Sequence, residues 1–301
     1  MTKNLSRALI LSLAAAAMTT VPASAMDIEA SGFFGNLGLP WDGETPRTDA
    51  VYPADLWLYG GRVAFAEQLN TGLSFMAEYE TDVVLRNIVR GIITYETGIA
   101  SISAGPMVGV FNSLKKPLKT GIDIGFRLEL AGLAFFSATV ESSMGAGFAT
   151  AGDYAQDLTR LSAGWYVNNA ICSLSMISKQ YTSILDSGDD MGSASTEYLF
   201  AVDVHKKGAP YRVLAELGYR VMTKTYADAT VDGLGAVVLG AQISAQLNST
   251  FSLVAGLDSG VYVFGLEHLA GHGPAPESFI FQGNLGVIVH LGGEKDADAG
   301  Q

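Results

Sequence analysis

Gly121-Ile-Asp-Ile-Gly-Phe-Arg-Leu-Glu-Leu-Ala131 is the stretch of this chain whose pattern decides the fold. One alternating set is apolar: Ile122, Ile124, Phe126, Leu128 and Leu130. The intervening set is small or charged: Asp123, Gly125, Arg127 and Glu129. A period of two predicts a β-strand with one apolar and one charged face. Two settings accept such a strand: the outer layer of a soluble sandwich, or a barrel wall between a bilayer and a wet lumen.

The beginning of the chain predicts export. Lys3 and Arg7 precede an apolar run over residues 8–18, and residues 21–25 end in an Ala-x-Ala cleavage pattern. This order is typical of a secretory signal peptide. We therefore expect a signal peptide over residues 1–25, with cleavage after Ala25.

Composition excludes several classes of protein. The formal net charge of −12 argues against a nucleic-acid partner, which requires a basic surface. Cys172 is the only cysteine, so the fold contains no intramolecular disulfide, and its neighbours predict an outward-facing small hydrophobe. Beyond the signal peptide no apolar run reaches the roughly 18 residues of a membrane-spanning helix. The apolar residues, 49% of the chain, are instead spread in alternation.

Alternating segments recur along the rest of the chain and predict about fourteen strands. We expect these strands over residues 28–37, 57–69, 73–82, 88–96, 99–111, 121–131, 133–143, 158–167, 170–181, 197–204, 211–221, 231–247, 251–264 and 279–291. Pro106 falls inside one of them and lacks an amide hydrogen, which predicts a bulge or a broken strand. The alternative is therefore about twelve strands.

The joints between these segments fall into two alternating classes. Short joints lie near Asn70, Glu96, Ala131, Asn168, Lys206 and Asn248. Longer, more polar joints lie near Gly43, Asn112, Gly147, Ser187, Ala227 and Gly271. The joint near Arg86 is the exception, because it is short where a long one is due. Aromatic residues near both classes of joint predict interfacial girdles: Trp57, Tyr59, Tyr198 and Phe279 near long loops, and Tyr95, Trp165, Tyr211 and Phe251 near short turns.

Taken together, the signal peptide, the strand count and the sorted joints resemble the bacterial outer-membrane β-barrel class, in particular monomeric fourteen-stranded porins. The resemblance covers the whole mature chain and is architectural. It implies an all-β, transmembrane, antiparallel up-and-down β-barrel over residues 26–291, followed by a polar C-terminal tail over residues 292–301. It also implies the cell outer membrane as location, its lipid and the barrel-assembly machinery as partners, and a monomer, although an oligomer is compatible with the pattern.

If the apolar faces meet lipid, the charged side chains line the lumen. The predicted pore-lining residues are Arg62, Glu78, Glu80, Asp82, Arg90, Asp123, Arg127, Glu129, Glu141, Arg160, Lys179, Glu197, Asp203, Arg212, Glu216, Arg220 and Asp258. The inward set also includes Asp27, Glu29 and Glu96, so that acids outnumber bases thirteen to seven. We expect a channel for passive diffusion of small hydrophilic solutes or ions, weakly favouring cations.

Other functions remain alternatives. Charge pairing inside the lumen could close it and leave a structural or adhesive surface protein, and a transporter of hydrophobic compounds or an outer-membrane enzyme fits less well. No nucleophile motif accompanies His268 and Glu267, the sole candidate pair at the outer rim, so we expect no catalytic residues. His268 and His272 share a face only on a helix, which the surrounding glycines and proline disfavour, and residues 186–190 lack the spacing of a calcium loop. We expect no metal and no cofactor.

Overall fold

The computed structural model describes residues 26–35, 58–82, 86–110, 118–143, 154–184, 190–206, 208–226, 229–265 and 280–291. These residues form fourteen β-strands and the turns between them. The strands are β1 (Met26–Gly35), β2 (Leu58–Asn70), β3 (Leu73–Asp82), β4 (Arg86–Glu96), β5 (Ala100–Val110), β6 (Leu118–Leu130), β7 (Ala134–Ser142), β8 (Tyr154–Val167), β9 (Ala170–Ile184), β10 (Asp190–His205), β11 (Tyr211–Tyr226), β12 (Ala229–Gln246), β13 (Phe251–Gly265) and β14 (Ile280–Leu291). No helix in the described ranges is long and apolar enough to cross a membrane.

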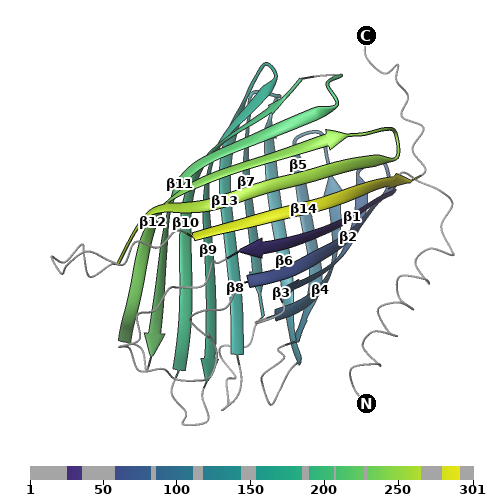
Figure 1. Cartoon of the computed structure of the whole chain (residues 1–301). Helices are drawn as coiled ribbons and strands as arrows, with labels where there is room; N and C mark the ends of the chain where they lie inside the picture. The colour runs from purple at the N-terminus through teal and green to yellow at the C-terminus, as the bar shows by residue number, and fades with distance from the viewer. Residues whose placement is uncertain are drawn as a thin grey trace.

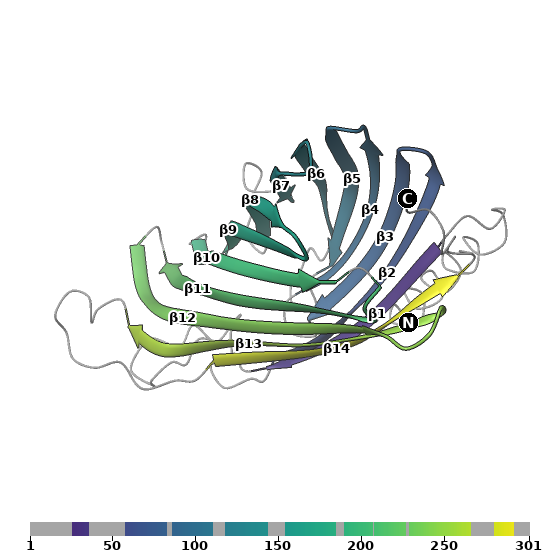
Figure 2. The ribbon, with the colours of Figure 1, turned by 90° about the horizontal axis from the view of Figure 1, so that it is seen from above.

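The strands form one closed barrel. Each strand pairs antiparallel with its neighbour in the sequence, and β1 pairs with β14 to close the ring (Figure 1). Seen from above, the ribbon encloses a single interior (Figure 2). The prediction of an all-β, up-and-down barrel of about fourteen strands is confirmed, and the alternative of twelve strands is wrong. The chain thus has the porin-like architecture that its sequence pattern resembles.

Strand β6 contains the alternating stretch and shows how the wall is built. Its partners on β7 keep the same parity, so that Asp123 lies opposite Glu141 and Ile124 lies opposite Val140. Asp123 is 3% exposed, whereas Ile124 is 47% exposed. The charged set of β6 therefore faces the interior and the apolar set faces outward, as a period of two requires.

The turn that ends β6 explains how the chain reverses so tightly. Ala131 and Gly132 both have positive φ, of 48° and 69°, and the amide of Leu133 donates to the carbonyl of Leu130 at 2.8 Å. Two successive positive φ angles define a type I′ turn, whose twist matches that of antiparallel strands. Gly132 accepts this conformation without strain because it has no Cβ.

Three features differ from the sequence-based expectation. β8 begins at Tyr154 and β10 at Asp190, ahead of the alternation, because backbone pairing continues beyond the apolar rows. β11 ends at Tyr226 and β12 begins at Ala229, so the joint near Ala227 is short, not long. β5 passes through Pro106 with the same register to β4 on both sides, so the strand is neither bulged nor broken.

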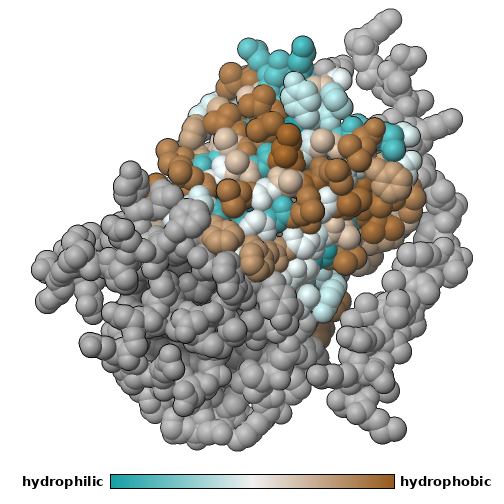
Figure 3. All heavy atoms as spheres, in the orientation of Figure 1, coloured by the Kyte–Doolittle hydropathy of each residue, from teal (hydrophilic) through white to brown (hydrophobic). Residues whose placement is uncertain are grey.

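The outer surface of the barrel is apolar. Large hydrophobic side chains cover much of the described part of the face in Figure 3. On the described strands, the exposed large hydrophobic residues lie on outward positions. Tyr95, Trp165, Tyr211 and Phe251, near short turns, are each at least 40% exposed. Tyr198 is 53% exposed but lies at the middle of β10 and not beside a long loop, because β10 begins at Asp190. Trp57 and Phe279 lie outside the described residues, as does the side chain of Tyr59.

Candidate functional site

The register places the predicted lumen residues on the inner face of the barrel. The inward set on the described side chains comprises Asp27, Glu29, Arg62, Glu78, Glu80, Arg90, Glu96, Asp123, Arg127, Glu129, Glu141, Arg160, Lys179, Glu197, Asp203, Arg212, Glu216, Arg220 and Asp258. The side chain of Asp82, the last residue of β3, lies outside the described residues. That these side chains line a conducting pore stays a prediction.

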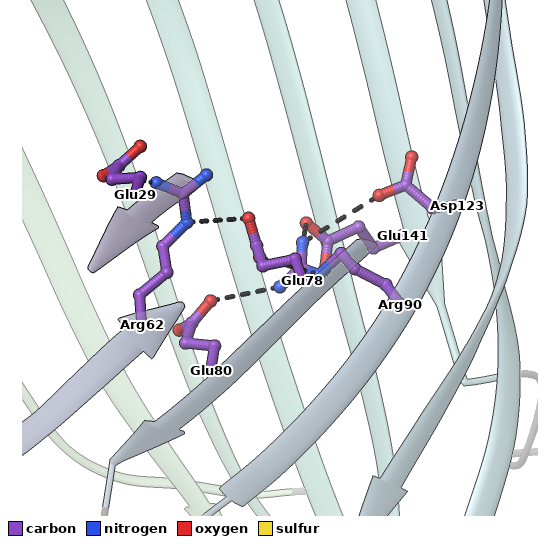
Figure 4. A network of polar contacts seen from close by, with 7 residues as sticks. All are labelled: Glu29, Arg62, Glu78, Glu80, Arg90, Asp123 and Glu141. Carbon is purple, nitrogen blue, oxygen red and sulfur yellow. Dashed lines mark hydrogen bonds and ion pairs between the residues drawn. The ribbon is translucent and has the colours of Figure 1, made fainter. Parts of the chain in front are cut away.

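Seven of these side chains form one network, the β1–β7 cluster, drawn in Figure 4. Its members are Glu29, Arg62, Glu78, Glu80, Arg90, Asp123 and Glu141. Arg62 joins neighbouring strands, because its Nη1 lies 2.7 Å from Oε1 of Glu29 and its Nε donates to Oε2 of Glu78 at 2.7 Å. The cluster therefore begins at β1 and continues along the wall.

Arg90 is the centre of the β1–β7 cluster. Its Nη1 donates to Oε1 of Glu141 at 2.7 Å, and its Nη2 donates to Oε2 of Glu80 at 3.1 Å. Its Nε lies 3.1 Å from Oε1 of Glu78, and its Nη1 lies 3.9 Å from Oδ2 of Asp123. Because Glu141 stands on β7, the guanidinium of β4 reaches past β5 and β6 along the inner wall.

Other ion pairs lie farther around the barrel. Arg220 donates through Nε to Oε1 of Glu197 at 2.6 Å and through Nη2 to Oδ2 of Asp258 at 3.1 Å. Arg212 pairs with Asp203 near the short turn between β10 and β11. All these pairs join inward positions of strands that lie next to, or two places from, each other. Charge pairing is thus a general property of this inner wall.

A further group lies beside the short turns of β6, β7 and β8. Arg127 donates to Oε1 of Glu129 at 2.6 Å and to the hydroxyl of Tyr166 at 3.0 Å, and Tyr166 donates to Oε2 of Glu129 at 2.9 Å. The guanidinium carbon of Arg127 stands 3.9 Å above the ring centre of Phe135, in cation–π geometry. Sequence reasoning found the two charges and missed Tyr166 and Phe135.

At the seam where the barrel closes, three side chains form a hydrogen-bonded chain. His290 of β14 lies with Nδ1 2.6 Å from Oδ1 of Asp27 on β1, and with Nε2 3.0 Å from Oγ of Ser252 on β13. The chain links the first strand to the last two. Asp27 and His290 are 263 positions apart in the sequence. Because a closed barrel pairs its first strand with its last, barrel closure was the feature from which their contact could have been predicted.

Sequence reasoning also missed the apolar part of the inner face. Buried hydrophobic side chains on inward positions include Ala64, Ile88, Ile92, Met107, Phe135, Leu158, Leu199, Ala201, Ala236 and Val238. Ile88 and Ile92 flank Arg90 on the same face of β4, so their parity was readable in the sequence. The inner wall is therefore a mosaic of ion pairs and apolar side chains.

Inward glycines let bulky neighbours lie along this wall. A Cβ at Gly164 would stand 2.4 Å from Cε1 of Phe135, and one at Gly218 would stand 2.5 Å from Cδ2 of Leu199. A Cβ at Gly240 would stand 2.8 Å from Oε2 of Glu216. These side chains therefore fold flat over glycines of the adjacent strands instead of pointing toward the barrel axis.

The described residues contain no group of three or more His, Cys, Asp or Glu side chains arranged to hold a metal ion. His268, His272, Glu267 and residues 186–189 lie outside the described residues. Cys172 lies on an outward position of β9, opposite Trp165.

Comparison with known proteins gives structural likeness alone. No family model and no curated protein matches the chain. A bacterial polysaccharide outer membrane secretin is 10% identical, with 90% of this chain and 100% of that chain covered and a TM-score of 0.49. An outer membrane channel from Pseudomonas putida F1 is 10% identical, with 90% and 97% covered and a TM-score of 0.48. The monoaromatic hydrocarbon channel CymD is 7% identical, with 89% and 88% covered and a TM-score of 0.45. Nothing about function follows from likenesses this distant.

Proposed function

We propose that this protein is an outer-membrane channel for passive diffusion of small hydrophilic solutes, with a weak preference for cations. The single observation that carries the proposal is the inverted distribution of its side chains. Exposed large hydrophobic residues occupy outward strand positions, while the paired charges occupy the inner wall. A soluble protein has no reason to expose so much contiguous apolar surface, but a barrel in lipid requires it.

Lipid of the outer membrane is accordingly the proposed partner of the outer face. A single closed barrel requires no second chain to satisfy its strand edges, which favours a monomer. Insertion by the barrel-assembly machinery is part of the same proposal, because the chain carries the export signal predicted over residues 1–25.

The inner wall supports passage of polar solutes. Barrels of this strand number have a wider lumen than eight-stranded barrels, whose side chains fill the interior. Phe135, Leu199 and Glu216 lie flat over glycines, which keeps their bulk at the wall. Acids exceed bases on this wall, and rings of acidic side chains favour cations.

Planar-bilayer recording on the refolded protein tests the proposal. We expect discrete conductance steps and, in a potassium chloride gradient, a reversal potential that reports modest preference for potassium over chloride. The control is the same preparation heated until its gel migration becomes that of the unfolded chain, which should give no steps. Absence of steps from protein that migrates as a folded barrel would exclude the channel and leave a structural or adhesive role.

A second candidate function, ester or peptide hydrolysis, is favoured by one observation: the order Ser252, His290 and Asp27 is that of a serine nucleophile chain. Two features place it below the channel. Asp27 is 57% exposed, whereas the acid of such a chain is normally buried, and the amide of Ser252 lies within the paired register of β13, away from an oxyanion role. We expect no labelling of Ser252 by a fluorophosphonate probe; labelling that Ser252→Ala abolishes would favour the hydrolase.

A further inference from the structure

Among the described side chains, the surplus of acid lies in one half of the inner wall. On β1 to β7 the described inward side chains include eight acids and three bases: Asp27, Glu29, Arg62, Glu78, Glu80, Arg90, Glu96, Asp123, Arg127, Glu129 and Glu141. On β8 to β14 four acids face four bases: Arg160, Lys179, Glu197, Asp203, Arg212, Glu216, Arg220 and Asp258. The net negative charge of the described inner wall therefore lies in the β1–β7 half.

Within that half, the buried floor of the β1–β7 cluster holds three acids and one base. Glu78, Asp123 and Glu141 are 6%, 3% and 6% exposed, and the guanidinium of Arg90, itself 8% exposed, is the buried cation among them. Arg62, at the more exposed rim, is shared between Glu78 and Glu29. Buried charge without a partner is costly, so the floor requires further positive charge.

Asp123 and Glu141 show where in the floor positive charge is lacking. They lie directly opposite each other on β6 and β7, both facing inward. Like charges in this cross-strand position repel each other. Arg90 binds Oε1 of Glu141, whereas Oε2 of Glu141 is buried and has no hydrogen-bond partner among the described residues. An unpaired carboxylate oxygen beside a second carboxylate is a site that a cation would complete.

We propose that Asp123 and Glu141, together with Glu78, form a transit site for a small inorganic cation on the lumen wall. The inference rests on the proposed channel function and adds where the cation passes and which side chains select it. The exposed rim of Glu29, Arg62 and Glu80, 24 to 34% exposed, is the side from which an ion in the lumen reaches the floor.

The site binds weakly, as conduction requires. The three carboxylates do not converge into a preformed chelate, and Arg90 shares the site with the entering ion. Selective conduction requires that an ion be attracted strongly enough to enter and weakly enough to leave. A potassium ion, held by carboxylate oxygens and its remaining water, suits these conditions better than a tightly chelated divalent metal.

The test compares one charge removed from each half of the wall. Glu141→Gln and Asp123→Asn each remove a charge from the site and retain an oxygen for Arg90, whereas the matched control Glu216→Gln removes a charge from the balanced half. In a potassium chloride gradient, Glu141→Gln and Asp123→Asn should each lower the potassium-to-chloride permeability ratio about threefold, the scale of one unit charge near an ion in a wet lumen. Glu216→Gln should change it much less.

The outcomes separate the site from the channel. Heat-modifiable gel migration establishes that each variant folds. Glu141→Gln and Asp123→Asn test the site separately, because each removes a different carboxylate. Equal losses in Glu141→Gln and Glu216→Gln would overturn the site while leaving the channel. A wild-type permeability ratio that rises between pH 7 and pH 9, and does not rise in Asp123→Asn, would show that a shared proton neutralises the pair and would also overturn the site. Wild-type protein without conductance would exclude both proposals.

Discussion

At the scale of single residues, a few arginines hold the carboxylates of the inner wall in place. Arg90 contacts four acids on three other strands, and Arg220 contacts two. The sequence predicted which charges point inward, because parity decides that. It did not predict the partners, because Arg90 and Glu141 are separated by 51 positions and meet only through the curvature of the wall. The candidate site was therefore predictable as a list and not as a geometry.

Removing Arg90 should be far more costly than removing an exposed arginine. Arg90→Met leaves Glu78, Asp123 and Glu141 buried without their central cation, and breaking a buried pair in this way costs about 3–5 kcal/mol of unfolding free energy. Arg212→Met removes the partner of Asp203, but the side chain of Arg212 is 59% exposed, so the loss should stay below about 1 kcal/mol. Urea unfolding in lipid vesicles, followed by tryptophan fluorescence, measures both. Equal losses would show that water solvates the cluster as fully as the exposed pair.

At the scale of the strand, alternation predicted all fourteen elements and erred mainly at their loop ends. The apolar row is needed only where a strand meets lipid, whereas backbone pairing can continue beyond it. β10 and β11 pair from Met191 and Tyr226 onward, through residues that carry no apolar row. Pro106 misled in the opposite direction: its side chain lies on the outer face of β5, and Gly105 lets the backbone of Gly91 approach too closely for a Cβ. A single proline is thereby accommodated without a change of register.

The inward glycines make a separate prediction about packing. Gly164→Ala would place a Cβ 2.4 Å from Cε1 of Phe135 and 2.9 Å from the carbonyl oxygen of Cys172, so ring and backbone must shift. Such overpacking costs about 1–3 kcal/mol. Gly98→Ala is the matched control, because a Cβ there meets nothing within 4 Å. We expect a lower urea midpoint and a smaller single-channel conductance for Gly164→Ala alone; an unchanged conductance would indicate that Phe135 moves along the wall and not into the lumen.

At the scale of the whole molecule, the barrel reverses the usual relation between burial and polarity. Its exposed large hydrophobic residues stand outside, and its buried charges stand inside except for Glu67, which lies on an outward position of β2. This inversion could be predicted from the sequence, because in a closed barrel the alternation of each strand places its apolar residues outside and its charged residues inside. The seam could not be read so directly: the contact of Asp27 with His290 depends on β1 and β14 meeting in one particular register. The alternation within each strand therefore predicts which face a residue occupies, but not the register in which β1 and β14 pair.

The location of the barrel in a membrane predicts how the free energy of unfolding responds to charges on the outer face. Ile124, 47% exposed at the middle of β6, and Leu133, 73% exposed in the turn after it, are both surface hydrophobes. In lipid, Ile124→Arg places a charge near the bilayer midplane and should cost about 2–4 kcal/mol of unfolding free energy, whereas Leu133→Arg near the interface should cost about 0–1 kcal/mol. Urea unfolding of both variants in phosphatidylcholine vesicles measures the difference. If the barrel stood in water, both arginines would be hydrated, and the two substitutions would change the free energy of unfolding equally.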